Sequence, residues 1–252
     1  MVIYKMLLTI IYIATFLIAL IGLILIAAML SNKMFVKIMN DVNSLADNFN
    51  QHDLNKYSHV KYYDIFKRLF DILFSIIFII LLSPIIVLIS IAIILDSNGP
   101  IIYRMKIIGR NGKMFYSYKF RTMKVFQKIT YENAVRDDSD SRITKFGLFL
   151  RKTLLDELPE LFNVLKGNMS IVGTSLAREY EYENISDAQK KILTSRKPGL
   201  TNLWIVSRDR NIYNYERKLL YDLYYLNNYS FKLDLSIIYR TIIFTLGETA
   251  SF

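Results

Sequence analysis

Cysteine is absent from this chain of 252 residues, and histidine occurs only twice. Without cysteine the chain can form neither disulfides nor thiolate metal sites. His52 and His59 lie in a polar stretch and fall short of a ligand set, so we interpret them as solvated side chains. Acidic residues are also few, because 22 of them face 32 lysines and arginines, a formal net charge of +10. This excess favours anionic partners such as phospholipid headgroups, nucleotides or nucleic acid.

Apolar residues, by contrast, make up 53% of the chain, and the mean hydropathy of +0.26 is too high for an ordinary soluble protein. The first apolar run, residues 6–30, is uncharged and, at ~1.5 Å per residue, long enough to cross a ~30 Å hydrocarbon core. It predicts an N-terminal transmembrane helix within residues 1–30. A cleaved signal peptide is the alternative, although the run is about twice the usual ~7–15-residue apolar region. Lys33 and Lys37 favour a cytoplasmic location for the chain that follows.

A second apolar run, residues 69–95, is interrupted near its middle by Ser83 and Pro84. Pro84 lacks an N–H and its ring clashes with the carbonyl of Ile80, so a kink is expected, and the Ser83 hydroxyl can bond back to the preceding turn. Basic residues flank the run on both sides, and a full crossing would translocate one of these flanks. We therefore predict a re-entrant helix that enters the membrane and returns. A Pro-kinked ordinary transmembrane helix remains the alternative.

Between these runs, residues 31–60 are rich in Asn, Asp and Lys and indicate a linker or a short juxtamembrane helix. Residues 61–252 are predicted to form the main domain, with the helix of residues 69–95 as part of it. Two β-rich runs joined through residues 110–112 predict a β-hairpin.

The stretch from residue 143 to 167 has leucines at helical spacing, and Gly167 is a natural C-cap. The C-terminal stretch, residues 219–247, predicts amphipathic helices in the membrane interface, with burial in the domain core as the alternative. The expected fold is therefore mainly α with a small β-hairpin (α+β), anchored to a membrane.

Asp156 and Glu157 form a carboxylate pair among basic residues. Pro159 suits the first turn of a helix, so the pair should fall at or just before a helix N-terminus. Acids there usually cap the helix, but the same setting keeps a carboxylate ready as a nucleophile or a Mg²⁺ ligand. From residue types alone, both roles remain open. The candidate phosphate-binding residues are Lys119, Arg121, Arg142 and Arg151.

Several sequence blocks follow one another along the chain: KRLFD, the apolar run with Ser-Pro, GRNGKMFYSYKFRTM, RITKFGLFLRKTLLDELPELFNVLKGNMSIVG and KPGLT. Together they resemble the monotopic polyprenyl-phosphate phosphoglycosyl transferases, the bacterial sugar transferase family, over about residues 61–246. The resemblance implies transfer of a phosphosugar from a nucleotide diphosphate sugar, such as a UDP-sugar, to polyprenyl phosphate. The expected place is the cytoplasmic face of the bacterial inner membrane, in capsule, exopolysaccharide or glycoconjugate synthesis. It also implies a re-entrant Ser-Pro helix.

By the same resemblance, Asp156 is the nucleophile that forms an aspartyl-phosphosugar, and Glu157 helps to hold Mg²⁺ or orients the acceptor. Both carboxylates are thus implied as magnesium ligands, and Mg²⁺ offsets the charge that would repel the attack. The implied partners are the nucleotide sugar, polyprenyl phosphate and the lipid bilayer. No nucleic-acid module is recognisable, so no nucleic-acid partner is expected. An oligomer is possible.

The chain departs from the family pattern at three places. Thr174-Ser175-Leu176 stands where the family has Pro-Arg-Pro, Met105 and Ile107 replace a common Gln and Arg, and residues 202–205 replace Gly-Trp-Ala-Gln. The attacking carboxylates are retained. These departures indicate an unusual donor or, as the alternative function, a catalytically weak or inactive membrane scaffold of the same fold in glycan assembly.

Overall fold

The protein is described by a computed structural model that covers residues 33–44, 61–124, 140–183, 185–207 and 215–245. The predicted transmembrane helix of residues 1–30 and both histidines lie outside these ranges.

The helices are α2 (Lys61–Asp96), α3 (Lys145–Lys152), α4 (Leu161–Lys166), α5 (Glu179–Glu183), α6 (Asp187–Thr194), α7 (Tyr215–Asn227) and α8 (Phe231–Thr245), with 3-10 helices η2 (Arg110–Gly112) and η3 (Leu155–Glu160). A further helix spans residues 33–44. The strands are β1 (Ile102–Ile108), β2 (Met114–Phe120), β3 (Ser170–Val172), β4 (Ala177–Arg178) and β5 (Gly199–Thr201). The prediction of a mainly helical chain with a small sheet is confirmed.

The predicted β-hairpin is also confirmed. β1 and β2 pair antiparallel, with Ile102 opposite Phe120 and Ile108 opposite Met114. β4 joins this hairpin as a third strand, and β3 forms a separate parallel pair with β5. The sequence patterns predict neither of these additions, because β3, β4 and β5 are only two or three residues long.

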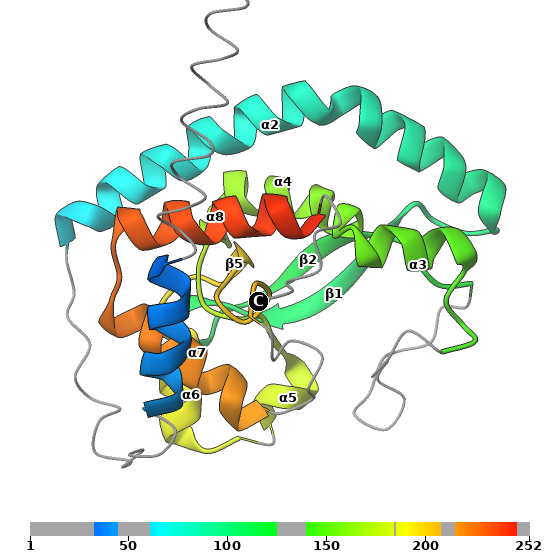
Figure 1. Ribbon diagram of the computed structural model, residues 1–252. Coiled ribbons are helices and arrows are strands. Elements are labelled where there is room, and N and C mark those ends of the chain that lie inside the picture. Colours follow the sequence, from blue (N-terminus) through cyan, green and yellow to red (C-terminus); the bar gives the residue numbers. More distant parts are fainter. Residues whose placement is uncertain (1–32, 45–60, 125–139, 184, 208–214, 246–252) are drawn as a thin grey trace, which may run out of the picture.

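α2 is one continuous helix that contains Pro84. Figure 1 shows it arching over the rest of the domain, with both ends turned toward the domain body and the middle farthest away. The predicted bond is present, since the Ser83 hydroxyl donates to the Ile80 carbonyl at 2.8 Å. This is the carbonyl that Pro84 leaves without its helical donor. Within the described residues, the segment Tyr63–Asp96 is the one helix long and apolar enough to cross a membrane.

Many apolar side chains of α2 are exposed along its length. They are Ile65, Phe66, Leu69, Leu73, Ile76, Ile77, Ile80, Leu81, Ile85, Val87, Leu88, Ile91, Ile94 and Leu95. A continuous apolar surface of this size marks a membrane or protein contact. Ile89 and Ile93 differ, because they are buried in a cluster with Phe120 and Leu150. The C-terminal half of α2 therefore rests on the end of β2 and on α3.

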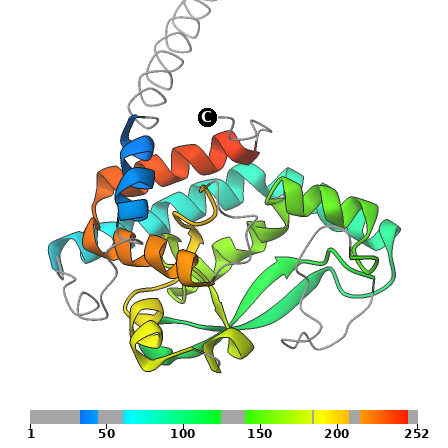
Figure 2. The ribbon, with the colours of Figure 1, turned by 60° about the horizontal axis from the view of Figure 1, so that its bottom comes forward.

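The N-terminal half of α2 is fixed by buried polar contacts. Lys67 forms an ion pair with Asp234 of α8. The Asp71 carboxylate accepts hydrogen bonds from the Ser170 hydroxyl and the Ile171 amide, at 3.0 and 2.9 Å. Figures 1 and 2 show α8 running beside this half of α2. Both halves of α2 are thus held to the same domain.

The main core includes part of the segment predicted as a linker or juxtamembrane helix. Residues 33–44 are helical, and Phe35, Ile38 and Val42 are buried in the same cluster as side chains of α4, α7 and α8. The helix alternative is therefore confirmed for these residues, and they belong to the body of the domain. Residues 45–60 lie outside the described part.

The C-terminal helices divide between the two predicted environments. Residues 219–226 of α7 are all buried, so the interfacial prediction is wrong for α7 and the core alternative holds. Its tyrosines fill core space rather than a headgroup belt. α8 buries Leu233 and Ile237 but exposes Leu235 and Ile242. An interfacial position of α8 stays a prediction.

Candidate active site

The carboxylate pair sits at a strained turn between two helices. Asp156 and Glu157 lie in the first turn of η3, as predicted, and η3 follows α3 after two residues. Leu154, the cap residue of η3, has a left-handed backbone with φ 55°. For a residue other than glycine such a backbone costs ~1–3 kcal/mol and persists where the surroundings enforce it. The turn directs Asp156 into the domain, where only 9% of the residue is exposed.

Lys119 of β2 is the cation at the centre of this site. Its ammonium lies 2.5 Å from a Glu157 carboxylate oxygen and 3.5 Å from one of Glu160. Glu160 is fully buried and also accepts a hydrogen bond from the Ser117 hydroxyl at 2.5 Å. The site therefore joins β2 to η3, and one ammonium serves several carboxylates.

Burial dominates the electrostatics of the site. Desolvation raises the pKa of Asp156 to about 7, although the charge of Lys119 opposes this shift; Glu157 raises the pKa and Arg151 lowers it. Glu160 responds in the same way, with its pKa raised to about 7 by burial and lowered by Lys119. The two carboxyl groups hold protons at a pH where an exposed carboxyl is ionised. Asp156 is thus poised to change charge near neutral pH.

The cap residue of η3 is Leu154, whose apolar side chain cannot cap a helix, and a hydrogen bond from the backbone amide of Asp156 lowers the pKa of its own carboxyl. The capping role of the acidic pair therefore stays a prediction. One carboxylate oxygen of Asp156, Oδ1, is buried without any hydrogen-bond partner. A buried acceptor left unpaired in this way costs stability, and it is available to a substrate or ion. The position of the Asp156 carboxyl therefore suits a side chain that reacts with a bound ligand.

Two of the four predicted phosphate-binding residues come together at this site. Lys119 contacts Glu157, and Arg151 is close enough for its charge to lower the pKa of Asp156. The Arg151 guanidinium also donates to the Thr122 hydroxyl at 2.9 Å, which orients it. These two cations can balance the charge of a phosphate group that approaches Asp156.

The other two predicted residues have different neighbours. Arg121 is buried and donates to the carbonyls of Ile93 and Ser97, so it fastens the C-terminal end of α2. Arg142 makes a forked pair with Asp140, with nitrogen–oxygen distances of 2.5 to 3.0 Å. The structure does not bring these two guanidinium groups to the carboxylates.

Glu160 and Ser117 are members of the site that sequence reasoning missed. Glu160 follows Asp156 by four positions in a segment read as helical, and such spacing places two side chains on neighbouring turns. That signal could have indicated Glu160. Ser117 carried no signal, because only the packing of β2 against η3 brings it there.

The carboxylates of this site are also the predicted ligands of a magnesium ion. In the described part of the chain, no group of three or more His, Cys, Asp or Glu side chains converges to hold a metal. Mg²⁺, however, is commonly held by one or two carboxylates together with substrate phosphates and water. The unpartnered Oδ1 of Asp156 suits such a ligand. Glu157 would have to share its carboxylate with Lys119.

The residues that depart from the family pattern are structural here. Ser175 is buried, and its amide and hydroxyl both donate to the Asp222 carboxylate, at 2.8 and 3.0 Å. Burial raises the pKa of Asp222 to about 6. Ile107 is fully buried in β1, and Trp204 packs against Tyr221 with ring centres 5.7 Å apart. The missing arginines are thus replaced by side chains that complete the core.

Comparison with known proteins agrees with the resemblance in the motifs. A family model described as bacterial sugar transferase matches residues 62–248, most of the chain, and the chain therefore belongs to this family. It is 40% identical to the galactosyl transferase CpsE of Streptococcus agalactiae, covering 74% of this chain and 42% of that protein. It is 38% identical to the undecaprenyl-phosphate galactose phosphotransferase of Salmonella typhimurium, covering 69% of this chain and 39% of that protein.

A shorter relative is aligned over most of its own length. The chain is 38% identical to the exopolysaccharide production protein ExoY of Sinorhizobium fredii, covering 70% of this chain and 83% of ExoY. The chain thus spans about two fifths of the two longer relatives.

Proposed function

We propose that this protein transfers a phosphosugar from a nucleotide diphosphate sugar, such as a UDP-sugar, to polyprenyl phosphate at the cytoplasmic face of the bacterial inner membrane. The observation that carries this proposal is the buried Asp156, whose Oδ1 lacks a hydrogen-bond partner and which lies beside Lys119 and Arg151. Family membership and the printed names of the relatives, which include an undecaprenyl-phosphate galactose phosphotransferase, support the same reaction.

In the first step, an ionised Asp156 oxygen attacks the phosphorus bonded to the sugar oxygen. The bond from that phosphorus to the bridging oxygen breaks, and a nucleoside monophosphate leaves. Lys119 and Arg151 balance the negative charge that gathers as two anions approach. The product is an aspartyl-phosphosugar, so a transfer between two anions is divided into two smaller steps.

In the second step, an oxygen of polyprenyl phosphate attacks the same phosphorus and releases the Asp156 carboxylate. The lipid phosphate is already ionised near neutral pH, so it needs no strong base, and Glu157 orients it. Glu160 and Ser117 keep Lys119 in place. Mg²⁺, bound by Asp156 and Glu157 with the donor's phosphates, would offset further negative charge.

The geometry of α2 supports the membrane part of the proposal. Both ends of α2 turn toward the domain, and most of its apolar residues are exposed. A helix that dips into the bilayer and returns would satisfy both features, with Ser83 and Pro84 at the bend. Its C-terminal half contacts Leu150 of α3, immediately before the turn that carries Asp156. The depth of α2 in the bilayer would therefore determine how far the reacting Asp156 carboxylate lies from the membrane surface.

The proposal is tested by measuring release of nucleoside monophosphate from a panel of UDP-sugars, with polyprenyl phosphate and Mg²⁺ present. At least one donor should yield monophosphate together with a sugar-phosphate lipid. Asp156→Asn should abolish both products, while the matched control Asp187→Asn should not, since the Asp187 side chain is fully exposed. Full activity of Asp156→Asn would refute the assignment.

A second candidate, a non-catalytic scaffold of the same fold, is favoured by one observation. Ser175 stands where the family has an arginine, and its side chain is occupied by Asp222 inside the domain. A scaffold would release no monophosphate with any donor, although it would still associate with membranes. The donor panel therefore distinguishes the two functions.

A further inference from the structure

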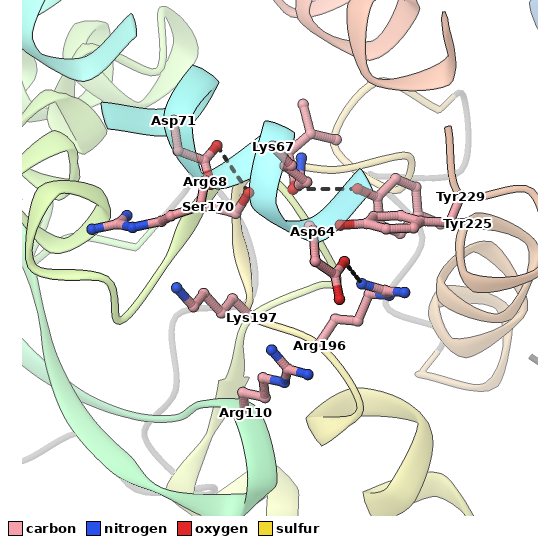
Figure 3. Close-up of a pocket in the computed structure, with 12 residues that line it drawn as sticks. Asp64, Lys67, Arg68, Asp71, Arg110, Ser170, Arg196, Lys197, Tyr225 and Tyr229 are labelled. Carbon is pink, nitrogen blue, oxygen red and sulfur yellow. Dashed lines mark hydrogen bonds and ion pairs between the residues drawn. The ribbon is translucent and has the colours of Figure 1, made fainter. Parts of the chain in front are cut away.

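A second polar pocket lies beside the first turns of α2. It encloses about 430 Å³, including the space at its open mouth. Asp156, Glu157 and Lys119 are not among its lining residues. Figure 3 shows charged side chains from α2, η2 and the loop before β5 converging on it.

Two of the cations around this pocket are already neutralised. Arg196 forms an ion pair with Asp64 and lies over the ring of Tyr229, 3.5 Å from its centre. Lys67 pairs with Asp234. Each of these two cations is therefore balanced by a carboxylate.

Arg68 is fixed in a different way. Its two terminal nitrogens donate to the carbonyls of Val164 and Leu165, at 2.7 and 2.8 Å, at the end of α4. These carbonyls carry only partial charge, so the guanidinium keeps most of its positive charge. Arg68 is therefore a rigid cation at the pocket edge.

Lys197 and Arg110 supply the remaining positive charge. Within the described part of the chain, neither side chain has a hydrogen-bond or ion-pair partner, and Figure 3 shows both directed toward the pocket. Burial lowers the pKa of Lys197, and the charges of Arg68 and Arg110 lower it further, while the charges of Asp71 and Asp64 raise it. Asp71 also lines the pocket, and its carboxylate already accepts two hydrogen bonds. The pocket therefore holds an excess of positive charge, which is costly without a bound anion.

We propose that this pocket is a binding site for a phosphate group, held by Arg68, Arg110 and Lys197. Two forked guanidinium groups and one ammonium match the oxygens of a phosphate ester. The site is separate from Asp156 and goes beyond the transfer reaction, which does not require it. Exposed Leu69 and Leu73 follow Arg68 along α2, so the phosphate belongs either to a phospholipid headgroup or to a soluble phosphate ester.

The test measures how fast Lys197 is acylated by an amine-reactive reagent, using mass spectrometry of the full chain in phosphatidylcholine nanodiscs. One arm adds inorganic phosphate, and a second arm replaces part of the lipid with phosphatidic acid. Bound phosphate should slow modification of Lys197 at least about fivefold once the ligand exceeds its dissociation constant several times. Exposed Lys113 serves as the internal control, with chloride at equal ionic strength as the control anion.

Protection in the first arm identifies a soluble phosphate source, and protection in the second identifies a lipid headgroup. Arg110→Gln is a change at an exposed turn. It should weaken the binding of whichever ligand protects Lys197 about tenfold, equivalent to about 1.4 kcal/mol. The proposal is overturned if neither ligand protects Lys197, or if chloride protects it equally. The labelling of Lys197 needs no catalytic turnover, so it can also be measured in Asp156→Asn. Failure of the transfer proposal would therefore leave the proposal of a phosphate site unaffected.

Discussion

Replacing Asp156 by Asn should stabilise the protein, and more so at pH 8 than at pH 5. Burial raises the pKa of this carboxyl to about 7 in the folded protein, against about 4 in the unfolded chain. The folded state thus holds a proton between these values that the unfolded state has released. Wild-type stability should therefore be full below pH 4, decrease as the pH rises toward 7, and level off above it. Asn cannot ionise and avoids this loss.

The magnitude follows from the difference of about three pKa units, each worth ~1.36 kcal/mol, which gives an upper limit of ~4 kcal/mol above pH 8. Small movements that admit water relieve part of this cost, so we expect about half, ~2 kcal/mol. For a domain of this size, that corresponds to roughly 4–8 °C in melting temperature. At pH 5 the carboxyl is protonated in the folded state, and the gain should be about one third as large.

The assay is thermal unfolding of wild type and Asp156→Asn in detergent without Mg²⁺, at pH 5 and pH 8. Asp140→Asn is the matched control, because hydrogen bonds from Arg142 lower the pKa of Asp140 to about 2. Asp140 is ionised at both pH values, so its replacement should lower the melting temperature equally at each. An Asp156→Asn effect that is the same at both pH values would refute the reasoning.

Three other changes probe the site and α2. Lys119→Met removes the shared ammonium and should reduce monophosphate release by about 100-fold; a loss of less than threefold would contradict its role. The charge of Asp156 raises the pKa of Glu160, and such an interaction acts in both directions. Glu160→Gln should therefore move the midpoint of a pH–rate profile to lower pH, and an unchanged midpoint would argue against coupling. Pro84→Ala should straighten α2 and move one flank across the membrane; cytoplasmic labelling of both flanks with unchanged transfer would exclude Pro84 as the cause of the bend.

Local patterns predicted the parts of this structure that depend on neighbouring residues. The Ser83 bond to Ile80, the left-handed Gly167 at the end of α4, and the position of Asp156 at a helix start were all readable from spacing. Each of these features is set within about five residues of the chain. Sequence spacing is a good guide at this range.

The composition of the candidate site was less predictable. Lys119 meets Glu157 across 38 positions, and Ser117 meets Glu160 across 43, so only tertiary packing decides these contacts. Arg121 shows the converse. It was predicted to bind phosphate, but the folded chain uses its guanidinium at the end of α2. The same limit applies to α7, whose aromatic residues suit both a membrane interface and a core.

The most direct test of the central claim is to trap the intermediate on Asp156. The full chain would be incubated with an active UDP-sugar and Mg²⁺, without polyprenyl phosphate, and its peptides analysed by mass spectrometry. The account predicts a sugar-phosphate adduct on Asp156 that disappears when polyprenyl phosphate is added and never forms in Asp156→Asn. Transfer to lipid without any adduct, or an adduct on another residue, would contradict it.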